Sequence, residues 1–192
     1  MKNTNKAKNV AMLAIEVWLD NEVITPQDLI NLANQKMYPG CLQITKENLP
    51  NIEEGMFWYT DDTVSSELVD KRIKSIVLHV TENEVIGDTF KEANVVGVDA
   101  PRYIAEFENE YIKKGEASYL SFTEMQDVQS NKTFINSSLS QIGKKMWRGV
   151  YMTSTDETKS HMRLVEIRSG MKHLAPKTSE GILRPVFRFK PE

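Results

Sequence analysis

The sequence has only one cysteine, Cys41, in 192 residues. A single thiol cannot form a disulfide within the chain, so the fold must be held by packing alone. This is typical of proteins that assemble in a reducing cytoplasm. We interpret Cys41 as a small buried or neutral thiol rather than as a nucleophile.

Signatures of catalytic, nucleotide and metal sites are also missing. The nine glycines form no phosphate-binding loop. The three histidines, His79, His161 and His173, have no metal-ligand spacing among themselves or with the cysteine. Asp61 and Asp62 offer too few oxygen ligands for calcium and are interpreted as a turn. We therefore predict a protein that is not an enzyme, with no catalytic residues, no metal and no cofactor.

The sequence also lacks long apolar runs and a strong charge of either sign. The run Val10–Ile15 is interrupted by Glu16 and is too short for a signal-peptide core, and no stretch reaches the length of a membrane span. The net charge is −3, and Lys and Arg form no stripe that could neutralise phosphates. We expect a chain made in the cytoplasm without a signal peptide, with neither nucleic acid nor membrane as a partner.

Two short helices are predicted near the N-terminus. Apolar residues recur at helical spacing from Lys8 to Glu22, and Thr25–Asp28 carries the capping and proline signals of a second helix, which Pro39 and Gly40 end. Two such helices cannot bury their apolar faces on each other alone. Residues 1–45 are therefore predicted as a helical hairpin that either attaches the protein to a partner or completes its own core. The residues suited to a partner surface are Met12, Trp18, Leu29 and Met37.

Residues 46–192 are predicted as a mixed α+β domain. Strand patterns occur at 57–59, 75–80, 85–87, 150–154, 162–168 and 182–189, and helix patterns at 101–114, after a cap at Ser121 or Thr123, and at 131–142. Pro185 falls inside the last strand pattern, which indicates an edge strand or a bulge. One sheet-centred core is predicted to contain Ile76, Leu78, Val165, Ile167 and Val186.

Several motifs in this part of the chain occur in a familiar order. They are Phe57–Leu68 (FWYTDDTVSSEL), the strand pattern Ile73–Val80, Tyr119–Met125 (YLSFTEM), Asn131–Leu139 (NKTFINSSL), Val150–Thr155 (VYMTST) and Leu183–Phe189 (LRPVFRF). Together they resemble the C-type-lectin-like domains of bacterial surface and fimbrial proteins and of phage receptor-binding proteins. The departures are Ser121 for the usual proline, Met152 for the usual tryptophan and Asp62 for the usual glycine. The resemblance covers about residues 55–192.

The resemblance implies a twisted antiparallel sheet with flanking helices, preceded here by the hairpin. It also implies a ligand site at the loop-and-sheet end formed by the last 48 or so residues. The calcium-dependent sugar-binding triplets of animal lectins are missing, since Trp147 is followed by Arg148 and Gly149. Binding would therefore be calcium-independent. Of the aromatics Trp58, Tyr59, Trp147 and Tyr151, we expect one or two to be accessible. The candidate ligand-binding residues are Trp147, Tyr151, His161, Arg163, Arg168 and His173.

The predicted function is a non-enzymatic binding or structural protein. The favoured hypothesis is a phage virion component, such as a head or tail fibre, a decoration protein or a receptor-binding protein. The alternative is a secreted bacterial adhesin or fimbrial module that binds a glycan or a protein. A retroelement-diversified variable protein is a third hypothesis, which amino acids alone do not test. Expected partners are other virion proteins or further copies of this chain, and a cell-surface glycan or protein.

Overall fold

The computed structural model describes residues 25–26, 28–29, 38 and 40–191. The chain divides into two compact units, Met1–Cys41 and Leu42–Glu192. The sequence placed a boundary after residue 45. In the structure, β1 (Leu42–Gln43) pairs antiparallel with β3 (Thr63–Ser65), so the residues just before 46 belong to the second unit.

In the first unit, the predicted start of the second helix is confirmed. The Asp28 backbone N–H donates to Thr25 Oγ1 at 3.2 Å, and Asp28 Oδ2 accepts from the Thr25 backbone N–H at 2.6 Å. These reciprocal bonds cap a helix whose first position is Pro26. Leu29 is helical and partly buried. The predicted helix at 8–22 and the proposed attachment residues Met12, Trp18 and Met37 lie outside the described residues.

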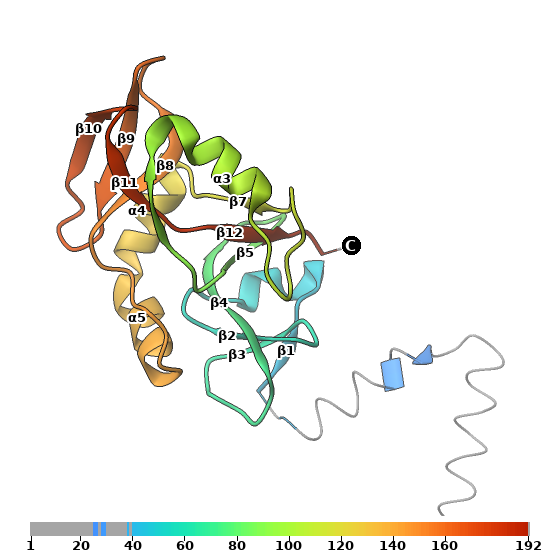
Figure 1. Ribbon diagram of the computed structural model, residues 1–192. Helices are drawn as coiled ribbons and strands as arrows, with labels where there is room; N and C mark the ends of the chain where they lie inside the picture. Colours follow the sequence, from blue (N-terminus) through green and yellow to red (C-terminus); the bar gives the residue numbers. More distant parts are fainter. Residues whose placement is uncertain (1–24, 27, 30–37, 39, 192) are drawn as a thin grey trace, which may run out of the picture. The chain divides into compact units, whose positions relative to one another are not determined.

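The second unit contains two sheets instead of the single sheet predicted (Figure 1). The first sheet has seven strands in the order β1-β3-β2-β4-β5-β12-β7, and all its pairs are antiparallel. It confirms the strands predicted near residues 57–59, 75–80 and 85–87. Its other members are β2 (Phe57–Tyr59), β4 (Ile73–Val80), β5 (Val85–Asp88), β7 (Ala117–Ser118) and β12 (Val186–Phe189).

The second sheet has five strands in the order β10-β9-β8-β11-β6. The β11–β8 pair is parallel and the other pairs are antiparallel, so this sheet is mixed. The sequence prediction missed β6 and β10. The strands are β6 (Ala93–Val96), β8 (Val150–Asp156), β9 (His161–Glu166), β10 (Lys172–Pro176) and β11 (Glu180–Leu183).

The last predicted strand is divided at Pro185, and its two halves join different sheets. β11 lies between β8 and β6, and β12 lies between β5 and β7. The prediction of an edge strand or bulge is therefore wrong. Proline has no N–H to donate to a ladder, and here it occupies the break between two interior strands. The Pro185 carbonyl accepts a hydrogen bond from Thr89 Oγ1 at 2.7 Å, which fixes this crossing point.

Helices cover both sheets. α4 (Phe122–Ser130) and α5 (Lys132–Gln141) pack on β4, and α4 also contacts β8 and β9. Ser121 caps α4 in a capping box with Glu124, as its position predicted. α3 (Ala100–Glu106) is shorter than the helix predicted at 101–114, because the chain turns extended at Phe107. Two 3₁₀ helices, η1 (Lys46–Asn51) and η2 (Gly97–Asp99), complete the unit.

The early end of α3 has a packing reason. Ile112, which falls within the range predicted as helical, is instead buried in the cluster that lines one face of the seven-stranded sheet with Trp58, Val77 and Phe187. The apolar residues between 101 and 114 therefore pack in two different clusters and do not form one helix face. The first half faces the five-stranded sheet through Ile104, and the second half returns to the other sheet.

All five residues predicted for the core are buried, but they divide between the two sheets. Ile76 and Leu78 lie in β4 and Val186 in β12, whereas Val165 lies in β9 and Ile167 directly follows it. Because side chains alternate along a strand, Ile76 and Leu78 point away from Val77 and toward the face covered by α4 and α5.

We expect Leu78→Ala and Ile167→Ala each to lower the free energy of unfolding by about 2–5 kcal/mol, because both truncations leave a cavity in a packed interior. Leu174→Ala is the matched control, since that leucine is 62% exposed in β10, and its cost should stay within about 0.5 kcal/mol. Urea denaturation of the three variants measures the difference. Equal small losses at Leu78 and Leu174 would contradict the assigned β4 packing.

Candidate functional site

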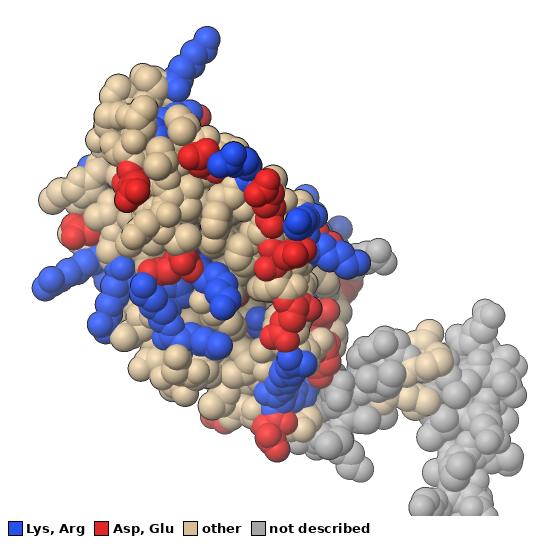
Figure 2. All heavy atoms as spheres, viewed as in Figure 1, with Lys and Arg blue, Asp and Glu red and all other residues tan. Residues whose placement is uncertain are grey.

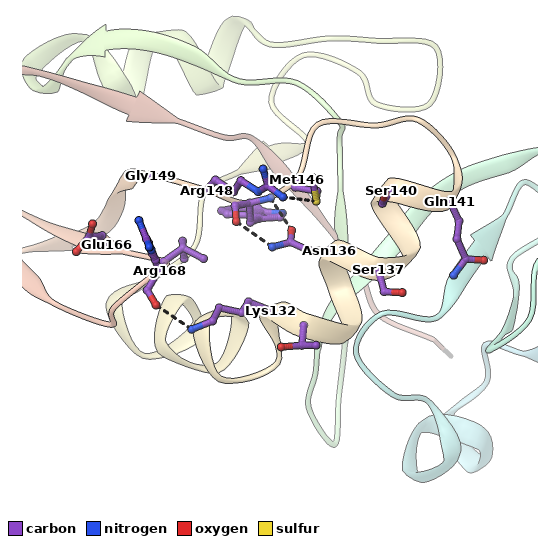
Figure 3. A pocket seen from close by; sticks show the side chains of 13 residues that line it. Lys132, Asn136, Ser137, Ser140, Gln141, Met146, Arg148, Gly149, Glu166 and Arg168 are labelled. Atoms are coloured by element: carbon purple, nitrogen blue, oxygen red, sulfur yellow. Dashed lines mark hydrogen bonds between the residues drawn. The ribbon is translucent and has the colours of Figure 1, made fainter.

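A pocket of about 930 Å³ lies between α5, the segment from Met146 to Gly149 and the end of β9 (Figure 3). This volume is within the range typical of small-molecule sites. Its lining includes hydroxyl, amide and cationic side chains, although apolar atoms make up the larger share of the wall surface. The lining residues are Lys132, Thr133, Asn136, Ser137, Ser140, Gln141, Met146, Trp147, Arg148, Gly149, Glu166, Ile167 and Arg168.

The Asn136 side chain joins α5 to the opposite wall. Its Nδ2 donates to the Trp147 carbonyl at 3.0 Å, and its Oδ1 accepts from the Trp147 N–H at 2.7 Å. One amide thus satisfies both backbone groups of the same residue, which fixes the segment against the helix (Figure 3). Asn136 is therefore a positioning residue for this wall.

The Trp147 side chain points away from solvent into a buried polar network. The residue is 1% exposed, and its Nε1 donates to Asp88 Oδ2 at 3.0 Å. The Arg184 guanidinium donates to the same carboxylate through Nη2 at 2.6 Å and Nε at 3.1 Å. It also lies over the indole, 4.6 Å from the ring centroid. Trp147 is thus held at both ends, through its backbone by α5 and through its ring by this ion pair.

The network reaches further through Arg184. Its Nη2 donates to the Lys145 carbonyl at 2.7 Å, and Nη1 lies 3.5 Å from Glu92 Oε2, to which the Tyr151 hydroxyl donates at 3.1 Å. Burial lowers the pKa of Arg184, but the Asp88 carboxylate outweighs it, so the pKa is raised and the charge is retained. Burial raises the pKa of Tyr151, which keeps its hydroxyl protonated.

The remaining wall is tied to α5 as well. Lys132 Nζ donates to the Arg168 carbonyl at 3.0 Å, and the Ile167 N–H donates to the Gly149 carbonyl at 2.9 Å. A turn returns the chain after β9, with the Gly170 N–H donating to the Glu166 carbonyl at 2.8 Å. Gly170 has φ +76°, which favours glycine. Three separate elements therefore surround the pocket with fixed backbones.

The structure distributes the six candidate ligand-binding residues over several places. Trp147 and Arg168 line this pocket. Arg163 and His173 line a second one of about 390 Å³ with Phe122, Glu157, Lys172 and Leu174. Tyr151 is buried in the polar network and reaches no surface, and His161 is exposed at the start of β9 and lines neither pocket.

The expectation of one or two accessible aromatics is wrong. The rings of Trp58, Tyr59, Trp147 and Tyr151 are all buried. Trp58 donates through Nε1 to Asp62 Oδ1 at 3.0 Å, so its polar edge is used inside the fold. Asp61 accepts from Thr63 Oγ1 at 2.7 Å, which confirms the predicted turn. Asp62 has φ +55°, a left-handed conformation that aspartate tolerates better than most residues.

Sequence reasoning missed the three residues that shape the pocket most directly, Lys132, Asn136 and Arg148. Lys132 and Asn136 fall in the segment Asn131–Leu139 that carries part of the family resemblance, so a signal for the location was present. No sequence feature identified Arg148 as a pocket residue, because a single arginine after a tryptophan forms no recognisable motif. Its importance depends on what the folded chain places around it.

Outside the pocket, His79 lies among acidic groups. Its Nδ1 is 3.5 Å from Glu54 Oε1, and its Nε2 is 3.8 Å from Asp127 Oδ2 in α4. A register shift in β4 between Val77 and His79 brings this side chain to the face that α4 covers. The Glu54 carboxylate close to Nδ1 is the main cause that raises the pKa of His79, with the charges of Asp127 and Glu124 adding to it against partial burial.

This geometry predicts a pH-dependent stability. Protonated His79 stabilises the fold fully below its unfolded pKa of 6.5, and the contribution is lost as the pH rises through the higher folded pKa. The same contact lowers the pKa of Glu54 below 4.5, so its contribution is lost in acid. We expect urea midpoints to fall between about pH 6 and 8, and His79→Gln to flatten that slope. His161→Gln, an exposed histidine, is the control, and an unchanged slope in His79→Gln would contradict the assignment.

In the part of the chain that the structure describes, no group of three or more His, Cys, Asp or Glu side chains is placed to hold a metal ion. Among the same residues, no helix is long and apolar enough to cross a membrane. Comparison of the chain with protein-family models and with curated proteins gave no match.

Proposed function

We propose that this chain is a non-enzymatic binding protein whose second unit is a displayed, C-type-lectin-like ligand-binding domain. The observation that carries the proposal is the open pocket beside α5, whose walls are held by hydrogen bonds and present hydroxyl, amide and cationic groups. Pre-organised walls reduce the entropic cost of binding. The wall offers hydroxyl, amide and cationic donors, which suit a polar ligand such as a cell-surface glycan or a polar protein segment.

Within this class, we favour a phage virion component in a fibre, decoration or receptor-binding position. The lone cysteine supports this, because a fold built without disulfides suits assembly in the reducing cytoplasm of a host. Residues 1–45 would supply the attachment to other virion proteins or to further copies of the chain. The alternative is a bacterial adhesin or fimbrial module, which the same pocket would serve equally well.

Two measurements test the proposal. Mass spectrometry and immunogold labelling of purified phage particles should detect the chain on the virion, whereas detection on bacterial surfaces without particles would favour the adhesin. Labelled protein should bind intact host cells, and periodate or protease treatment of the cells shows whether a glycan or a protein is the receptor. Absence of binding to any cells would contradict a displayed binding domain.

A truncation that removes residues 1–41 and keeps β1 tests the attachment role. If the removed residues attach the protein, residues 42–192 should keep their strand content and cell binding while losing association with the particle or with other copies. Circular dichroism and sedimentation measure these properties separately. Unfolding or aggregation of the truncated chain would mean that residues 1–41 complete the core instead.

A further inference from the structure

The arginines of this chain divide into two groups by their partners. All seven lie in the described residues. Five have a carboxylate within 4.0 Å, namely Arg72, Arg102, Arg163, Arg184 and Arg188. The two without one in this part of the chain, Arg148 and Arg168, both line the pocket beside α5. Since they come from different segments, their convergence on one cavity is a property of the fold.

Both arginines are exposed and stand on backbones that the fold holds in place. Arg148 lies between Trp147, held by Asn136, and Gly149, held by the Ile167 N–H. Its Nη2 lies 3.3 Å from Met146 Sδ, a weak acceptor that leaves the guanidinium charge unneutralised. The Arg168 carbonyl is held by Lys132 Nζ (Figure 3).

The charge of the pocket is therefore positive. Lys132, Arg148 and Arg168 face a single lining carboxylate, Glu166, which already accepts a hydrogen bond from Ser169 Oγ. In Figure 2, Lys and Arg side chains gather on the side where Figure 1 shows α4 and the ends of β9 and β10. The protein as a whole has a net charge of −3, so this concentration of positive charge is local.

The rest of the wall is rich in neutral hydrogen-bonding groups. Thr133, Ser137, Ser140 and Gln141 present hydroxyls and an amide along α5. These groups both donate and accept, as sugar hydroxyls require. Guanidinium groups bind carboxylate, sulfate and phosphate oxygens through paired N–H donors.

We propose that this pocket binds an acidic saccharide, with Arg148 and Arg168 holding its anionic group and the α5 hydroxyls and amide holding its ring hydroxyls. The inference rests on the proposed binding function and names its ligand chemistry. The anion is a carboxylate or a sulfate or phosphate ester on the sugar. A nucleic acid is disfavoured, because the cations of the pocket form one local cluster and no stripe along which a phosphate backbone could run.

Titration calorimetry of the full chain with short oligosaccharides tests this. Oligogalacturonate, sulfated dextran oligomers and phosphorylated dextran oligomers carry the three anions, a neutral dextran oligomer is the uncharged reference, and a short single-stranded DNA is the competing polyanion. We expect at least one acidic saccharide to bind at least tenfold more tightly than both the neutral oligomer and the DNA. The preferred anion identifies the source of the charge.

Charge-neutral variants locate the site. Arg148→Gln and Arg168→Gln should each weaken binding of the preferred saccharide about tenfold or more, as expected for loss of a charge-assisted bond. Arg102→Gln, with a side chain 72% exposed in a pair with Asp99, removes the same charge elsewhere and should leave affinity unchanged. All three should retain the wild-type melting temperature, since the removed groups are exposed.

Three outcomes would overturn the inference: neutral and acidic oligomers binding equally or not at all, DNA binding as tightly as every saccharide, or Arg102→Gln losing as much affinity as the pocket variants. The proposed function is tested independently by cell binding. Binding to cells that survives in Arg148→Gln/Arg168→Gln would refute the acidic-saccharide site and leave the displayed binding domain intact.

Discussion

Asp88→Ala should lower the free energy of unfolding by about 3–5 kcal/mol, because it leaves the buried Arg184 guanidinium without its closest counter-charge. The Arg184 side chain is 1% exposed and that of Asp88 is 0% exposed. The substitution also removes the acceptor of the Trp147 Nε1 bond and leaves that buried donor unsatisfied. Denaturant midpoints of wild type and variant give the loss directly.

Asp99→Ala is the matched control for this prediction. It breaks an Asp–Arg pair at 3.2 Å on the surface, which should cost less than about 1 kcal/mol. The double variant Asp88→Ala/Arg184→Met should lose less than the sum of its single variants, because it removes both buried charges together. Additive losses would show that the two side chains do not act as a pair in the folded protein.

Asp88→Ala also tests how the pocket wall is positioned. Trp147 connects the Asp88–Arg184 pair to the pocket wall, so loss of the pair should also free the segment that carries Arg148. Asn136→Ala would release that segment from α5 while leaving the ion pair in place. Comparing the ligand affinities of Asp88→Ala and Asn136→Ala shows whether the ion pair or the Asn136 amide positions this wall.

The sequence predicted local features that depend on nearby residues. The caps at Thr25 and Ser121 and the end of α5 near residue 142 depend on residues a few positions away, and the strands around 57–59, 75–80 and 85–87 show as local apolar patterns in the sequence. These features were confirmed. They also sufficed to predict the mixed α+β class.

The errors arose where distant contacts decide the outcome. The alternating pattern from Ile182 to Phe189 is consistent with one strand, and only the positions of β8 and β5 show that its halves belong to different sheets. Buried Arg184 at the break reads in sequence as an ordinary charged residue. Burial of an arginine depends on a partner 96 positions away, here Asp88, which periodicity does not reveal.

Of the six candidate ligand-binding residues, Trp147 and Arg168 line the pocket, and both lie in the C-terminal stretch where the resemblance implied a ligand site. Trp147 was expected to contact a ligand, but its ring is buried in the interior, and its backbone groups hydrogen-bond to Asn136 in the pocket wall. The sequence pattern does not distinguish a buried tryptophan from a ligand-binding one, since both can be aromatic residues just before a strand.

Gly55→Ala should be the second strongly destabilising substitution, with a loss of about 2–5 kcal/mol made of two effects. Gly55 has φ +90°, and an L-residue there costs roughly 1–2 kcal/mol. A Cβ at this position would also lie 2.9 Å from the Phe134 backbone carbon and 3.2 Å from the Ile135 N in α5. Forcing such atoms apart typically costs a further 1–3 kcal/mol.

Gly115→Ala separates the two effects, because Gly115 has φ +84° but no atom within 4 Å of an added Cβ. It should lose only the conformational part, about 1–2 kcal/mol, and the difference between the two variants measures how closely α5 packs. Gly55 also connects that helix to the sheet, since its N–H donates to the Val77 carbonyl at 2.8 Å and its carbonyl accepts from Ser138 Oγ. Displacing α5 would move Lys132 and Asn136, so Gly55→Ala should weaken ligand binding in the pocket while Gly115→Ala leaves it unchanged. Equal stability losses in the two variants would contradict the close approach of α5 on which the geometry of the pocket depends.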